Sequence, residues 1–239
     1  MNTVKIDKKN TLMVAHMGVS GIEKENTCAA FVAAGNRSYY GVETDVHRTG
    51  DGKFVICHDA DLFRVAGEKI NVEEVSLEIS ESVVLFDRDG TKDRNDLRPC
   101  PLEDYIRICK KYEKHCVLEL KSDFSQEEIA KIIDIIKDID YIDEVTFISF
   151  IYSNLKKVRE ILPNQSAQYV FIEITDEEIE KMAKDRIDAD FGYWNMREEH
   201  VKKFHEKGLK VNCWTVDDKE IAERVISWGI DYLTSNILE

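Results

Sequence analysis

Histidines and carboxylates that could perform acid–base chemistry occur in short segments between residues 16 and 119. They are His16, Glu43, Asp45, His58 and Glu119. Imidazole titrates near neutrality, so His16 and His58 could act as an acid–base pair, one removing a proton from a nucleophile and the other protonating a leaving alkoxide. Three converging carboxylates would repel one another unless a cation lay among them. Glu43, Asp45 and Glu119 offer only oxygen ligands, a donor set that suits Mg²⁺ or Ca²⁺.

The spacing of these residues predicts how strands would position them. Residues two apart on a strand point to the same face, so Glu43 lies with Asp45 and Glu119 lies with Lys121. A metal at this point could polarise a phosphoryl oxygen, and the Lys121 ammonium could hold a phosphate oxygen. His16 ends the first predicted strand at the same rim. The pattern therefore indicates a phosphate-processing site.

Apolar, β-rich runs predict eight strands, which alternate with helical patterns. The runs cover residues 12–17, 41–47, 116–121, 145–150, 166–171, 189–194, 210–216 and 231–235. Strand–helix alternation with short loops implies parallel strands. Eight such strands predict an α/β fold of the closed (β/α)8 type, the TIM barrel.

The predicted helices carry start and stop signals. Capping boxes, in which a side chain and a backbone amide satisfy each other, are expected at Ser125, Thr175 and Asp217 because each precedes a glutamate by three residues. Gly208 and Gly229 stand where helix C-terminal caps are expected.

One strand-like run, residues 53–59, breaks the alternation. Residues 48–52 alone separate it from the strand at 41–47, and five residues cannot hold a crossover helix. The turn at 49–52 therefore predicts a hairpin. We expect residues 48–98 to form an insertion above the barrel mouth, within a single domain that spans residues 1–239.

Composition restricts the partners and the cellular setting. The net charge of -14 makes nucleic acid an unfavourable partner and disfavours binding to anionic lipid. The first residues lack the apolar core of a signal peptide, and no stretch approaches the roughly 18 apolar residues of a membrane span. The six cysteines form no CxxC pair, which favours free thiols in a reducing compartment. We expect a cytoplasmic protein with a small-molecule substrate and no stable membrane anchor, and the oligomeric state is open.

The chain also resembles the glycerophosphodiester phosphodiesterase family over nearly its whole length. The motifs that carry the resemblance are His16-Met17-Gly18, Glu25-Asn26-Thr27, Glu43-Thr44-Asp45-Val46, Asp51-Gly52, His58-Asp59 with Arg64, Glu119-Leu120-Lys121 and Trp214-Thr215-Val216. The resemblance implies a divalent metal on the three carboxylates, acid–base roles for the two histidines, and substrate contacts from Lys121 and Trp214. The activity it implies is hydrolysis of glycerophosphodiesters to an alcohol and sn-glycerol 3-phosphate, within lipid and glycerol metabolism.

One departure from the family pattern bears on the substrate. The family usually has an arginine after the first histidine, where it holds the phosphate in a bidentate manner, and this chain has Met17. Lys24, Arg48 or Lys121 could take its place. Because of Met17, an alternative hypothesis is a different phosphodiester substrate, such as that of a lysophospholipase D or a sugar phosphodiesterase. A catalytically silent protein that binds a phosphate ligand is a further alternative.

Four residues near these motifs have two interpretations each. Glu25 and Asn26 either hydrogen-bond to the metal-binding and acid–base residues and hold them in place, or they belong to a helix cap. In the second case Asn26 caps a helix at 28–34. Trp214 is either a substrate wall or a core residue. For Arg64, ordering of the insertion is favoured over phosphate contact.

Overall fold

The computed structural model describes residues 2–239, and within them eight parallel strands close into a barrel. They are β1 (Leu12–Ala15), β2 (Gly41–Arg48), β5 (His115–Leu120), β6 (Val145–Ser149), β7 (Ser166–Phe171), β8 (Asp188–Gly192), β9 (Val211–Trp214) and β10 (Tyr232–Ser235). β10 pairs with β1, and pairing of Val14 with Gly41 joins β1 to β2 and closes the ring. Each predicted strand overlaps an observed one, and the predicted (β/α)8 TIM barrel is confirmed.

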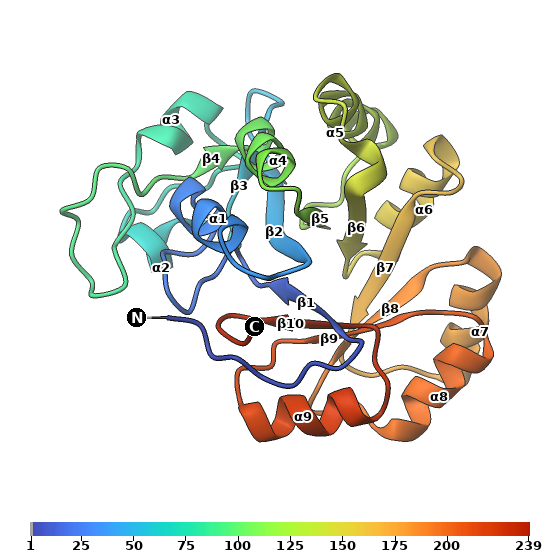
Figure 1. Cartoon of the computed structure of the whole chain (residues 1–239). Helices are drawn as coiled ribbons and strands as arrows, with labels where there is room; N and C mark the ends of the chain where they lie inside the picture. The colour runs from blue at the N-terminus through green and yellow to red at the C-terminus, as the bar shows by residue number, and fades with distance from the viewer. Residues whose placement is uncertain (1) are drawn as a thin grey trace.

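Helices surround the barrel and cover the outward face of its strands (Figure 1). They are α1 (Cys28–Gly35), α4 (Leu102–Lys111), α5 (Gln126–Asp138), α6 (Tyr152–Ile161), α7 (Asp176–Asp185), α8 (Glu198–Glu206) and α9 (Lys219–Ser227). In α5 the isoleucines at 129, 132, 133 and 136 form one fully buried stripe. Burying each such side chain contributes about 1.5–3 kcal/mol, so the apolar stripe fixes which face of the helix meets the sheet.

The helix ends follow the predicted signals with one exception. Ser125 and Thr175 form complete capping boxes at the starts of α5 and α7. The prediction of a box at Asp217 was wrong, because Asp218 caps α9. The Asp217 carboxylate instead accepts hydrogen bonds from the backbone and side-chain amides of Asn236. A residue expected to serve a helix end thus supports the end of a barrel strand.

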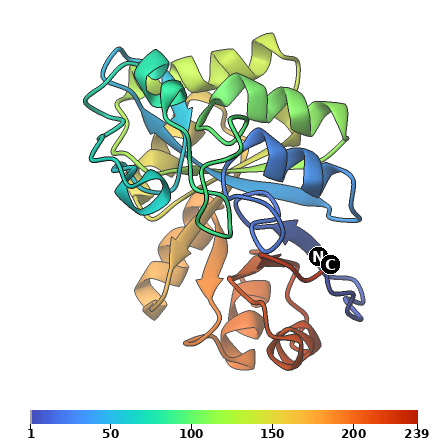
Figure 2. The ribbon, with the colours of Figure 1, turned by 90° about the vertical axis from the view of Figure 1, so that its left-hand side faces the viewer.

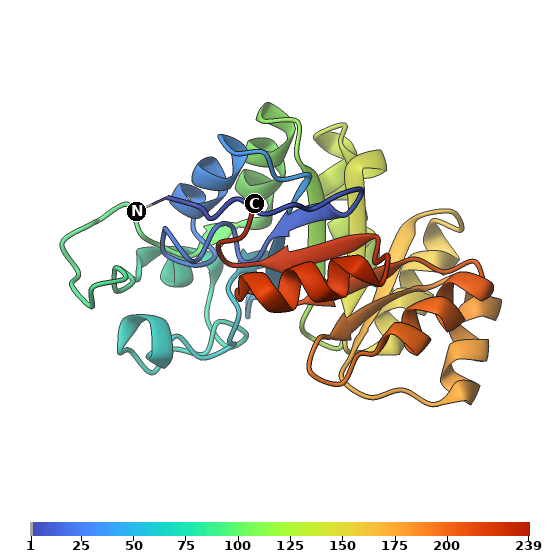
Figure 3. The same cartoon turned by 60° about the horizontal axis from the view of Figure 1, so that its bottom comes forward.

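The segment after β2 stands at one side of the barrel (Figures 1 and 3). β3 (Phe54–Ile56) pairs antiparallel with the end of β2, which confirms the predicted hairpin. Two short helices, α2 (Phe63–Ala66) and α3 (Leu77–Ser82), follow, and β4 (Cys100–Pro101) returns to pair with β3. β3, α2 and α3 share a small apolar cluster apart from the main core. The segment therefore has a fixed position from which it presents His58 to the barrel mouth.

The segments next to the two chain ends pair with each other and lie on the same side of the molecule in Figure 2. Val4 bridges Leu238 in a short parallel pairing. The Glu239 carboxylate accepts hydrogen bonds from Ser38 and forms an ion pair with Lys5, with 2.6 Å between Nζ and Oε1. No helix among residues 2–239 is long and apolar enough to cross a membrane, and the six cysteines are unpaired.

Candidate active site

A cluster of three carboxylates lies at the carboxyl-terminal mouth of the barrel. Glu43 and Asp45 project from β2, and Glu119 projects from β5, where it is the register partner of Asp45. One oxygen from each carboxylate can be chosen so that all lie within 4.8 Å of one another. All three side chains are buried. The arrangement matches the predicted strand geometry.

Electrostatic repulsion within the cluster favours a cation. Burial, together with the charges of Asp45 and Glu119, raises the pKa of Glu43 well above its usual range. Burial and Asp45 likewise raise the pKa of Glu119 to about 8. Lys121 Nζ lies 3.4 Å from Asp45 Oδ1 and 3.1 Å from Glu119 Oε1. Burial alone would lower the pKa of Lys121, but these carboxylates outweigh it and the pKa is raised. One ammonium against three carboxylates leaves negative charge that a hard divalent cation would balance.

Asn26 holds Asp45 in place from behind. Its Nδ2 donates to Asp45 Oδ2 at 2.8 Å, and its Oδ1 accepts from Thr44 Oγ1 at 2.7 Å. Asn26 adopts a positive φ of 55°, a conformation that asparagine tolerates better than most residues. The cap of α1 is Thr27. Of the two interpretations of Asn26, the structure thus favours support of the carboxylates over capping.

The turn after β1 brings backbone to the cluster. The Met17 amide donates to Glu43 Oε2 at 2.8 Å, and Met17 has a φ of 49°. Gly18 has a φ of 80°, and a Cβ at this position would lie 2.5 Å from the Ala30 Cβ. Only glycine fits here, which lets α1 approach the turn closely.

His16 is oriented by a chain of polar groups. Its Nδ1 lies 2.7 Å from Asn236 Oδ1, and Asn236 Nδ2 donates to Asp217 Oδ2 at 2.5 Å. Because the Asp217 carboxylate only accepts, the Asn236 oxygen faces His16, and His16 Nδ1 must donate. His16 Nε2 is then left without a proton, 3.9 Å from Glu43 Oε2. Burial lowers the pKa of His16.

His58 is oriented by a second chain. Its Nδ1 lies 2.8 Å from Asp59 Oδ1, and Asp59 Oδ2 accepts from Arg64 Nε at 2.5 Å. Arg64 also donates to both Glu25 oxygens, at 2.9 and 2.6 Å. Arg64 thus links the insertion to the loop before α1, in agreement with the structural role expected for it. Glu25 is connected to His58 only through this series of hydrogen bonds, and it does not line the pocket that contains both histidines.

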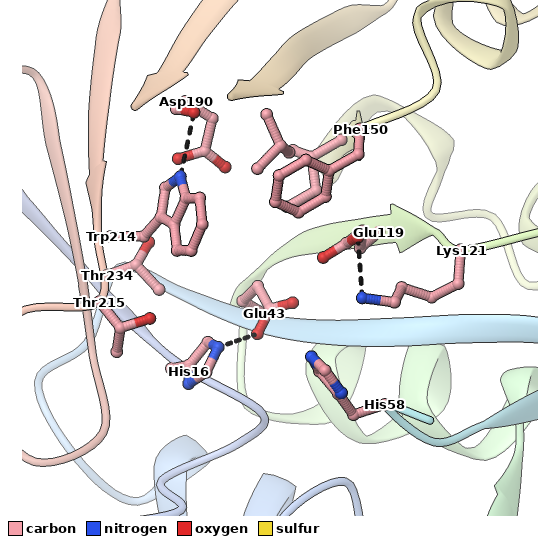
Figure 4. A pocket seen from close by; sticks show the side chains of 12 residues that line it. His16, Glu43, His58, Glu119, Lys121, Phe150, Asp190, Trp214, Thr215 and Thr234 are labelled. Atoms are coloured by element: carbon pink, nitrogen blue, oxygen red, sulfur yellow. Dashed lines mark hydrogen bonds and ion pairs between the residues drawn. The ribbon is translucent and has the colours of Figure 1, made fainter. Parts of the chain in front are cut away.

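Glu43, Glu119, Lys121 and both histidines line one pocket (Figure 4). Its other wall comes from the ends of β6 to β10 and comprises Ile148, Phe150, Val170, Asp190, Trp214, Thr215 and Thr234. The Trp214 indole donates to the Asp190 carbonyl at 3.0 Å, and its ring meets Phe150 edge to face. Trp214 therefore lines the pocket.

Sequence reasoning missed several residues of the site. Asn236 and Asp217 follow barrel strands at their carboxyl-terminal ends, where polar residues of this fold gather, and this position was the available signal. Asp190 lies within a predicted strand, and nothing in the local sequence marked it.

The three basic residues considered as replacements for the missing arginine lie in different places. Lys121 lines the pocket. Lys24 lines a separate pocket beside Arg64, and Arg48 pairs with Glu128 at 3.3 Å. Of the three, Lys121 lies in this pocket, and Lys24 and Arg48 lie outside it.

Comparison with known proteins places the chain in a family. Residues 16–238 match the model of the glycerophosphoryl diester phosphodiesterase family. The chain is 29% identical over 226 residues to a glycerophosphodiester phosphodiesterase of Caldanaerobacter subterraneus subsp. tengcongensis, covering 92% of each. Over 62 residues it is 39% identical to a lysophospholipase D of Rattus norvegicus, covering 26% of this chain and 20% of that protein.

A solved structure shows the same fold. The phosphodiesterase of Oleispira antarctica, in complex with its product sn-glycerol-3-phosphate, superposes with a TM-score of 0.86 at 23% identity. The match covers 98% of this chain and 96% of that one. With the family match extending over almost the whole sequence, the chain belongs to the glycerophosphoryl diester phosphodiesterase family and is a phosphoric diester hydrolase.

Proposed function

We propose that this enzyme hydrolyses glycerophosphodiesters to an alcohol and sn-glycerol 3-phosphate, with a divalent metal and two histidines. The observation that carries the proposal is the convergence of Glu43, Glu119, Lys121 and both imidazoles on one pocket (Figure 4). Asp45 completes the carboxylate cluster beside it. The product bound to the Oleispira antarctica phosphodiesterase supports the choice of substrate.

Glu43, Asp45 and Glu119 would hold Mg²⁺ or Ca²⁺. When bound, such an ion polarises a phosphoryl oxygen and stabilises the charge that develops there. Lys121 borders the same cluster. Its ammonium would lie beside an oxygen of a phosphate bound there. Lys121 would thereby supply part of the positive charge that is missing because Met17 stands in place of the family's usual arginine.

His16 is suited to the role of base. Its Nδ1 proton is held by Asn236, so the lone pair of Nε2 faces the pocket. The lowered pKa of His16 keeps the ring neutral near pH 7, where a base must be unprotonated. Nε2 would take the proton of the attacking hydroxyl, either water or the glycerol hydroxyl next to the ester, the latter giving a cyclic phosphate.

His58 is suited to the role of acid. The Asp59 carboxylate accepts from its Nδ1 and stabilises positive charge on the ring. His58 Nε2 would then give its proton to the leaving alkoxide. Arg64 and Glu25 fix Asp59, so the ring keeps one orientation although it projects from the insertion.

The test is release of glycerol 3-phosphate from glycerophosphocholine and glycerophosphoethanolamine. We expect turnover with Mg²⁺ or Ca²⁺ and none in EDTA. His16→Ala should abolish most activity, whereas a silent binding protein would have no activity for this change to remove. Absence of turnover across a broad panel of phosphodiesters, with either metal, would refute the proposal.

A lysophospholipase D activity is the second candidate. Phe150, Ile172 and Trp194 are large apolar side chains between 45% and 52% exposed. They follow neighbouring barrel strands, and Phe150 and Trp194 both contact Trp214 at the pocket wall. An acyl chain could lie on this rim. A higher kcat/KM for a short-chain lysophosphatidylcholine than for glycerophosphocholine would favour this candidate over the first.

We also propose that residues 1–239 work as one phosphodiesterase domain, with residues 48–98 as the insertion that carries His58. The unpaired cysteines support a reducing, cytoplasmic setting.

A further inference from the structure

Asp190 is a fourth acidic side chain in the pocket, and the mechanism above does not use it. It lies on β8, is 2% exposed, and lines the wall across the pocket from the two histidines (Figure 4). Its Oδ1 is buried with no hydrogen-bond partner among residues 2–239. An unpaired buried acceptor is costly, and in an enzyme pocket it marks a place where a ligand can supply the donor.

None of the described residues donates a hydrogen bond to Asp190 Oδ1. Its register neighbours on the inner face of the barrel are Val170, which is apolar, and Asn212, which is already paired with Thr234 at 3.0 Å. Lys121 is engaged by the metal-site carboxylates. Among residues 2–239, the acidic group close enough to share one ion consists of Glu43, Asp45 and Glu119, and it does not include Asp190.

The surroundings of Asp190 indicate a neutral donor. Ile148, Val170 and the Trp214 ring line the same wall. Burial and the charge of Glu119 raise the pKa of Asp190 well above its usual range, so the carboxyl group is disposed to be uncharged. An uncharged carboxyl still accepts a hydrogen bond through its carbonyl oxygen but provides little attraction for an ammonium group. A hydroxyl group therefore suits this position better than a cationic headgroup.

We propose that Asp190 accepts a hydrogen bond from the terminal hydroxyl of the substrate's glycerol group and thereby selects diesters in which that hydroxyl is free. The inference rests on the proposed function, because it takes the phosphate to lie at the carboxylate cluster and Lys121. The glycerol hydroxyl next to the ester then stays near the phosphate. The terminal hydroxyl lies farther along the glycerol and reaches the opposite wall. Asp190 in this role determines specificity and does not touch the reacting atoms.

The experiment compares ligands that differ by one hydroxyl. Binding of sn-glycerol 3-phosphate and of 2-hydroxypropyl phosphate, which lacks only the terminal hydroxyl, is measured by calorimetry with Mg²⁺ present. In parallel, kcat/KM is measured for glycerophosphocholine and 2-hydroxypropyl phosphocholine. The variants are Asp190→Asn, which keeps an acceptor oxygen, and Asp190→Leu, which keeps the approximate shape without one. Asp188→Asn, on the same strand and outside the pocket, is the matched control.

Wild type should favour the glycerol ligand by roughly five- to hundredfold, the cost of leaving one buried acceptor unpaired. Asp190→Leu should bring this ratio close to one, Asp190→Asn should keep part of it, and Asp188→Asn should keep it all. An unchanged ratio in Asp190→Leu would overturn the inference. So would an equal fall in kcat/KM for both diesters in that variant, which would indicate recognition of the choline cation that they share. If no diester is turned over, the proposed function fails, and the calorimetry still decides the role of Asp190.

Discussion

Replacing Glu119 by glutamine should stabilise the metal-free enzyme while removing a proposed metal ligand. Burial and Asp45 raise the pKa of Glu119 from an ordinary value of 4.5 to about 8. The unfolded chain loses this proton more readily than the folded chain, so the metal-free protein loses stability as the pH rises from about 4.5 to about 8. The interval from the ordinary pKa of 4.5 to pH 7 is about 2.5 pH units. At about 1.4 kcal/mol per unit, the ionisable group costs roughly 3 kcal/mol of folding free energy.

Thermal unfolding in EDTA measures this effect. Near pH 7 the Glu119→Gln variant should melt roughly 6–12 °C above wild type, at about 2–4 °C per kcal/mol for a domain of this size. The gap should close towards pH 5. Mg²⁺ or Ca²⁺ should then raise the melting temperature of wild type and leave that of the variant unchanged.

The control is Glu160→Gln on α6, which alters an exposed glutamate and should leave the melting temperature unchanged. Equal melting temperatures for wild type and Glu119→Gln in EDTA at every pH between about 5 and 8 would refute the reasoning. They would mean that the three carboxylates do not repel one another enough to destabilise the metal-free protein.

Further outcomes concern the proton-transfer groups and the turn after β1. His16→Ala and His58→Ala should each lower kcat by about 10²- to 10⁴-fold, measured by initial rates, and leave metal affinity in a titration unchanged. Because the pKa of His16 is lowered, the acidic limb of kcat/KM should have its midpoint below pH 6.5, and a midpoint above that value would contradict the assignment of His16 as base. Asn236→Ala frees His16 Nδ1 and should lower kcat by about tenfold or more. Gly18→Ala should lower the free energy of unfolding in urea by more than about 1 kcal/mol, and by more than Gly208→Ala, since Gly208 also has a positive φ but nothing within 4 Å of an added Cβ.

The barrel could be predicted because its signals are local. Each strand is an apolar run, and helices such as α5 carry a stripe of period 3.6 that is legible without knowing what it packs against. The capping box at Ser125 has the same local character. The failure at Asp217 has a tertiary cause, because its partner Asn236 is distant in sequence and reaches it only after β10 has closed the ring.

The same distinction separates the predicted part of the site from the missed part. Glu43 and Asp45 are two residues apart on one strand, so their shared direction follows from strand geometry alone. The partners that orient the two histidines differ in how easily the sequence reveals them. Asp59 is adjacent to His58, whereas the partner of His16 is Asn236, at the other end of the chain. Asp190 has no signal in the sequence, because an aspartate in a strand shows neither its burial nor its lack of a partner.

The barrel mouth is divided between two sets of strands. The residues proposed to perform chemistry come from β1, β2, β5 and the insertion, whereas the facing wall comes chiefly from β6 to β9. Mutations on the second set can therefore reshape the ligand cavity while the reacting groups keep their geometry. Such enzymes could acquire new diester substrates through substitutions at Phe150, Ile172, Asp190 or Trp194 alone, while the reaction stays the same.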